Sequence, residues 1–132
     1  MTHEKMKKVL KRIRSFSEMA HATRQEREHL QTLTHTNPQE HEDNLITYLE
    51  TGTGFVMSPG VVRDILDDKG PIGTGSILTD GEWAWADDLA WYVKTYHIRL
   101  PEEFVRHAMQ NGWQVPAFSR ERLLSLDLPE DD

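Results

Sequence analysis

Four carboxylates around an Asp-Gly turn are the residues best suited to chemistry: Asp80, Glu82, Asp87 and Asp88. Paired carboxylates can act as general acid and base, as in glycoside hydrolysis, and nearby aromatic side chains could stack on sugar rings. Asp80, however, is required by the turn, and Asp87 or Asp88 is required at the start of the following helix. Two of the four therefore have structural roles, and we expect no catalytic residue among them.

Other signatures of catalysis or cofactor binding are missing from the sequence. None of the seven histidines has the close spacing of the helical zinc motif, although His97 and His107 lie ten residues apart on separate predicted helices. The glycine-rich residues 51–54 and 70–75 lack the spacing and the Lys-Ser/Thr pair of a phosphate loop. There is no cysteine and no Gly-x-Ser-x-Gly nucleophile motif. We expect no metal, no cofactor and no enzymatic activity.

Three of the four tryptophans lie in the same stretch as the acids. Large aromatic side chains usually belong to the core, but exposed ones beside acids are typical of a protein-binding hot spot. Two of the tryptophans share a face of the predicted hairpin, and the third lies off the apolar stripe of the next helix. The candidate partner-binding residues are Glu82, Trp83, Trp85, Asp87, Asp88 and Trp91.

The elements that would position these residues begin with a hairpin. Asp80-Gly81 between two strand-like runs is the strongest short-range hairpin signal. With these two residues as the turn, Leu78 faces Trp83, and Trp85 lies on the same face. Residues 61–66 are the expected third strand, which gives an antiparallel meander of three or four strands.

Helices are predicted before and after this meander in the sequence, and they are expected to flank it on one side. Asn37-Pro38 begins a helix to about residue 51, and Pro101 followed by two acids begins another that ends at Asn111-Gly112. A helix over residues 88–97 lies between them. Ser119 caps a last short helix, with Phe118 and Leu123 at the spacing of a hydrophobic staple.

The N-terminal segment is predicted to form a long amphipathic helix with one apolar stripe and many basic residues. A membrane surface, nucleic acid or a second copy in a homodimer are alternative contacts for such a helix. We favour packing on the acidic body. The stripe consists of Met6, Val9, Leu10, Ile13, Phe16, Met19 and Ala20.

Length and charge suggest one domain with two electrostatic parts. The chain has 132 residues, a single-domain length, and a net charge of −7. Residues 1–36, a basic helical arm, carry eight Lys and Arg against four Asp and Glu, or +4, which leaves −11 for residues 37–132. The acidic α+β body spans 37–128 and ends in a frayed tail over 129–132. Such a body repels nucleic acid and can attract a basic protein.

Composition also bears on location. No apolar run approaches the roughly 18 residues of a membrane span. The basic N-terminus is not followed by the apolar segment of a secretory signal. The absence of cysteine favours a cytoplasmic location.

A resemblance covers about residues 61–113. Thr79-Asp-Gly-Glu-Trp-Ala-Trp, then Asp88-Leu-Ala-Trp-Tyr-Val, Tyr96-His and Leu100-Pro-Glu-Glu-Phe resemble a block in small uncharacterised bacterial proteins. Some of these are similar in size and acidity to immunity proteins of bacterial toxin systems. The resemblance implies no catalytic residue.

The sequence therefore predicts an α+β domain with a non-enzymatic role. The expected function is binding of a basic protein, in the manner of an immunity or inhibitor protein that neutralises a toxin. The alternative is a small ligand-binding domain or enzyme, with a pocket between the hairpin of residues 76–85 and the helix of residues 88–97.

Overall fold

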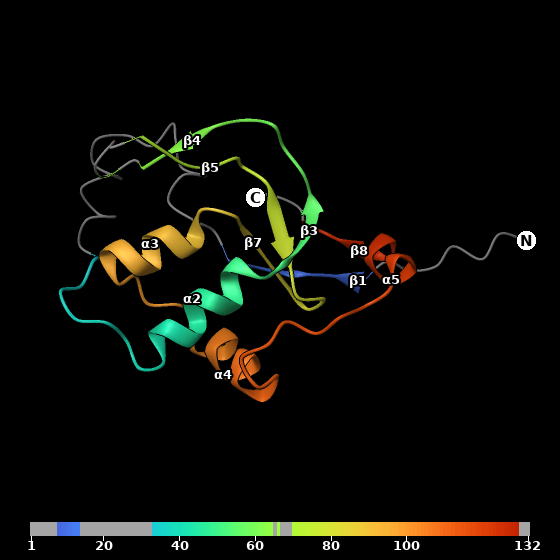
Figure 1. Ribbon diagram of the computed structural model, residues 1–132. Helices are drawn as coiled ribbons and strands as arrows, with labels where there is room; N and C mark the ends of the chain where they lie inside the picture. The colour runs from blue at the N-terminus through green and yellow to red at the C-terminus, as the bar shows by residue number, and fades with distance from the viewer. Residues whose placement is uncertain (1–7, 14–32, 65, 67–69, 130–132) are drawn as a thin grey trace, which may run out of the picture.

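The computed structural model describes residues 8–13, 33–64, 66 and 70–129, which form an α+β fold (Figure 1). The strands in these residues are β1 (Lys8–Val9), β2 (Lys11–Ile13), β3 (Thr53–Val56), β4 (Val62–Arg63), β5 (Pro71–Gly73), β6 (Ile77–Thr79), β7 (Trp83–Ala86) and β8 (Leu126–Asp127). The helices are α2 (Glu42–Glu50), α3 (Leu89–Tyr96), α4 (Glu102–Gln110) and α5 (Arg120–Leu124).

The central sheet has four strands in the order β2-β7-β6-β3. The hairpin β6–β7 and the β3–β6 pair are antiparallel, which confirms an antiparallel unit, whereas β2 joins β7 in parallel. The expected third strand over residues 61–66 is wrong: β4 covers only Val62–Arg63 and pairs with β5 in a separate two-stranded sheet. β3 pairs with β6 where Gly52 allows the chain to approach Leu78 of β6, whose Cβ would lie 2.9 Å from a Cβ at position 52. A Cβ on Gly52, just before β3, would lie 2.7 Å from the Trp85 ring.

The hairpin forms with a register two residues away from the predicted one. Thr79 faces Ala84 and Leu78 faces Trp85, so the connection is longer than two residues. Its cause is the Asp80 side chain, whose Oδ1 accepts hydrogen bonds from the backbone N–H groups of Glu82 at 2.9 Å and Trp83 at 2.8 Å. Side chains alternate with a period of two, so this shift keeps every residue on its predicted face.

The N-terminal residues form strands instead of the predicted helix. β1 runs parallel to β8 and β2 parallel to β7, and the backbone N–H of Lys11 donates to the carbonyl of Glu82 at 2.9 Å. Leu10 and Ile13 are buried. Pairing with the edges of β7 and β8 outweighs the helical pattern, because it satisfies backbone groups and buries apolar side chains together. The remainder of the predicted helix, residues 6–7 and 14–20, lies outside the described residues.

The helices begin close to the predicted positions, with one exception. Ser119 caps α5 by accepting from the Arg122 N–H, as predicted. Asp88 precedes α3 but makes no side-chain cap bond. α2 begins at Glu42 rather than after Asn37. The preceding residues instead contact the end of α3, where the Gln39 amide donates to the carbonyl of Ile98 at 2.8 Å.

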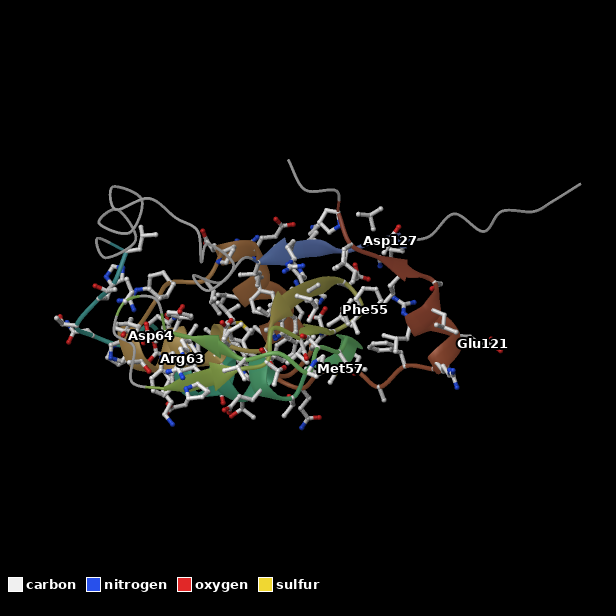
Figure 2. All side chains as sticks on the ribbon, turned by 90° about the horizontal axis from the view of Figure 1, so that it is seen from above. Phe55, Met57, Arg63, Asp64, Glu121 and Asp127 are labelled. Atoms are coloured by element: carbon white, nitrogen blue, oxygen red, sulfur yellow. The ribbon has the colours of Figure 1, made fainter. Side chains whose placement is uncertain are left out.

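Apolar residues fill both faces of the sheet. One face packs against α2, α3 and α4, which lie together in Figure 1. The opposite face packs against α5 and β8. A smaller cluster joins α3 to the segment around β4 and β5. Figure 2 shows Arg63 and Asp64 near one end of the molecule and Glu121 of α5 at the other.

Candidate functional site

Three of the predicted partner-binding residues lie in the core. Trp83 is 7% exposed, while Trp85 and Asp88 are fully buried. The indole N–H of Trp85 donates to the carbonyl of Leu49 at 3.0 Å, which ties the hairpin to α2. Because these side chains are covered by their own chain, they cannot form the contact surface that the sequence suggested.

The other three predicted residues are partly exposed but already engaged. Asp87 accepts from the Thr74 hydroxyl at 2.6 Å and fixes the loop before β6. The indole N–H of Trp91 donates to Asp64 at 2.9 Å. Glu82 forms an ion pair with Lys8, and this interaction lowers the pKa of Glu82. The six residues therefore do not come together as one surface.

A polar cluster that the sequence did not predict surrounds Asp80. The Tyr48 hydroxyl donates to Asp80 Oδ2 at 2.6 Å, and His107 Nε2 lies 3.1 Å from the same oxygen. The Asn111 amide donates to the Tyr48 hydroxyl at 2.9 Å. Burial, aided by the Asp80 carboxylate, raises the pKa of Tyr48 far above its ordinary range. The cluster joins the hairpin tip to α2 and to the C-terminal end of α4.

One signal of this cluster was present in the sequence. His107 and Asn111 are four residues apart, so they lie on the same face of α4 and its C-terminal turn. Asp80 was assigned only to its turn. Nothing in the sequence indicated that Tyr48, from a separate helix, would meet it.

Two pockets adjoin this cluster. The larger, of about 340 Å³, lies between the hairpin tip, the end of α4, the loop that follows it and α5. A smaller pocket of about 190 Å³ lies on the other side of His107 and Glu82, which line both. Neither pocket is lined by a residue of α3, so neither occupies the predicted place between the hairpin and residues 88–97.

Left-handed backbone conformations gather at the N-terminus of α2. His41, His97 and Trp113 have φ values of 59°, 54° and 60°, a region that side chains other than glycine rarely occupy. The rings of His41 and Trp113 lie 5.1 Å apart, and His97 Nδ1 lies 2.8 Å from the buried carboxylate of Glu42. Such conformations persist where surrounding contacts impose them, and they cluster at functional sites.

The exposed side of α2 and the residue before His41 carry acids. Glu40, Asp43 and Glu50 are exposed, and within the described part of the chain no Lys or Arg pairs with them. Trp113 is partly exposed, and its ring contacts His41 at the N-terminus of α2. We call Glu40, His41, Asp43, Glu50 and Trp113 the α2 surface.

Two features are absent from the described residues. Within them, no group of three or more His, Cys, Asp or Glu could hold a metal ion. None of the helices seen there has the length and apolar character needed to cross a bilayer.

No protein-family model, curated protein or solved structure matches the chain. The resemblance of residues 61–113 to small immunity-like proteins therefore stays a prediction.

Proposed function

We propose that the protein is a non-enzymatic binding domain, of the immunity or inhibitor type, that neutralises a basic partner protein such as a toxin. The single observation that carries this proposal is the α2 surface, where three exposed acids have no Lys or Arg partner in the described residues and His41, next to Glu40, contacts the ring of Trp113. Acidic charge attracts a basic partner, and a tryptophan can anchor the contact.

The ion pairs of Glu82 in the hairpin and Glu103 in α4 support this location. Glu82 and Glu103 already pair with Lys8 and Lys11, so the negative charge that either carboxylate presents to a basic protein is partly neutralised. Among the described residues, no Lys or Arg pairs with the acids of the α2 surface. Electrostatic attraction to a basic surface therefore concentrates on α2 rather than on the hairpin, where the sequence pattern had suggested it.

The backbone before α2 is held in place by hydrogen bonds, so a partner can bind there without moving it. Hydrogen bonds from Gln39 and Arg99 hold the segment before α2 against the segment after α3. A surface that is held in place before binding loses less conformational entropy when a partner arrives.

The test is affinity capture from a lysate of the source organism at low and high salt. The protein is compared with the triple variant Glu40→Gln, Asp43→Asn, Glu50→Gln. We expect the protein to retain a basic protein at low salt, release it at high salt, and bind it roughly tenfold more tightly than the variant does, from about 0.5 kcal/mol per lost ion pair.

A matched control separates a local contact from net charge. Glu102, Glu121 and Asp127 are exposed acids on other elements, and changing them to amides alters the net charge equally. This control should retain the partner. Recovery of no basic protein at low salt, or equal losses in both triple variants, would contradict the proposal.

A further inference from the structure

The larger pocket at the hairpin tip is built from groups of both charge signs and an apolar wall. Its charged and polar groups come from the hairpin, α4 with its C-terminal turn, and α5. Its volume of about 340 Å³ is at the lower end of the range for small-molecule sites, which suits a ligand of amino-acid size. The lining residues are Asp80, Glu82, His107, Asn111, Pro116, Ala117, Phe118 and Arg122.

The guanidinium of Arg122 retains capacity to bind an anion. Its Nη2 lies 3.7 Å from Glu82 Oε1, beyond hydrogen-bond distance, and that oxygen is already paired with Lys8. Within the described residues, the guanidinium donates no hydrogen bond. It lies over the hairpin tip, where a Cβ on Gly81 would be 3.8 Å from Arg122 Nε. A carboxylate entering the pocket can therefore receive two parallel N–H donors from it.

Two acceptors in the pocket suit an ammonium group. Glu82 Oε2 accepts no hydrogen bond from any described residue. His107 lines the pocket, and its Nε2 lies 3.1 Å from the buried Asp80 carboxylate. In the neutral ring whose Nε2–H donates to Asp80, Nδ1 is an acceptor.

The signs of these groups select among ligands. A simple anion would be attracted by Arg122 but repelled by Glu82. A simple cation would be attracted by Glu82 but repelled by Arg122. A zwitterion satisfies both groups and leaves no uncompensated charge in the pocket. Phe118, Pro116 and Ala117 provide an apolar wall for the rest of the molecule.

We propose that this pocket binds a free α-amino acid with an apolar side chain, its carboxylate on Arg122 and its ammonium between Glu82 and His107. This site is separate from the α2 surface. It requires no protein partner and goes beyond the function proposed above.

The test uses L-leucine as the probe, with binding measured by calorimetry and by amide chemical shifts. Two analogues each lack one charge: 4-methylpentanoate has no ammonium, and 3-methylbutylamine has no carboxylate. We expect leucine to bind and both analogues to bind at least about tenfold more weakly, the factor that corresponds to about 1.4 kcal/mol. No detectable leucine binding at about 10 mM, or an analogue that binds as tightly, would overturn the proposal.

Variants with matched controls locate the site. Arg122→Gln and Glu82→Gln should each weaken leucine binding at least about tenfold. Arg120→Gln and Glu121→Gln make the same chemical changes on exposed positions of α5 outside the pocket and should leave it unchanged. Circular dichroism verifies that all four variants are folded. Equal losses in variants and controls, or unchanged binding in both pocket variants, would refute the assignment.

Discussion

Replacing Tyr48 by Phe measures the contribution of the buried Asp80 cluster. The Tyr48 hydroxyl donates to Asp80 at 2.6 Å and accepts from Asn111 at 2.9 Å. Tyr48 and the Asp80 side chain are both fully buried, so water cannot readily replace the lost bond. A hydrogen bond to a charged group contributes about 1.5–3 kcal/mol. Tyr48→Phe should therefore lower the free energy of unfolding at pH 7 by about 2 kcal/mol.

The pH dependence of the same variant gives an independent measure. Burial, with help from Asp80, raises the pKa of Tyr48 above its ordinary value of 10.0. The folded state then keeps the phenolic proton at a pH where the unfolded state loses it. Stability from this group is therefore full below pH 10 and falls as the pH rises above it. The loss reaches about 1.4 kcal/mol at pH 11, and Phe cannot show it.

The assay is urea denaturation followed by tryptophan fluorescence, at several pH values from 7 to 11. The difference in unfolding free energy between the protein and Tyr48→Phe should be about 2 kcal/mol at pH 7 and narrow by about 1.4 kcal/mol by pH 11. A difference below about 0.5 kcal/mol at pH 7, or one that stays constant to pH 11, would show that the hydroxyl is not part of a stabilising network.

Three further predictions concern packing, capping and charge, and denaturation curves test each. Gly52→Ala should cost about 1–3 kcal/mol, because its Cβ would lie 2.7 Å from Trp85; a cost below about 0.5 kcal/mol would contradict this packing. Ser119→Ala should cost about 1 kcal/mol through loss of the α5 cap, and an unchanged midpoint would argue against it. Lys8 lowers the pKa of Glu82, so this pair stabilises the fold above the unfolded pKa and ceases to do so as the pH falls. Lys8→Met should reduce the loss of unfolding free energy at acid pH by under about 0.5 kcal/mol, because the pair is exposed. A larger loss at acid pH in the variant than in the protein would be inconsistent with this pairing.

Sequence patterns correctly predicted the features that are determined by residues close together in the sequence. The Ser119 cap and the start of α4 after Pro101 depend on neighbouring residues, and both are as predicted. The helix prediction was wrong for residues 8–13 because the competing interaction is not local: Lys11 pairs with Trp83, far away in the sequence. A three- and four-residue apolar repeat cannot reveal a strand edge that only the rest of the fold provides.

The candidate site was harder to predict than the fold. Asp80 was correctly assigned to its turn, but the same carboxylate also binds Tyr48 and His107 from two helices. Turn chemistry explains one role of a residue and does not exclude another. Trp113 has a left-handed backbone conformation and contacts His41, which is distant in the sequence, so no local pattern could indicate that contact.

In the fold, basic residues of the N-terminal segment pair with acids of the body, so the two charged parts of the sequence are not separate. Lys8 and Lys11 pair with Glu82 and Glu103, 74 and 92 residues away, so these N-terminal cations are part of the body. Their pairing reduces the charge that the hairpin can offer a partner, while the acids of the α2 surface have no Lys or Arg partner in the described residues. Association through α2 should therefore weaken with salt and with neutralisation of α2 acids. Glu82→Gln should leave it unchanged, which also distinguishes the α2 surface from the amino-acid pocket.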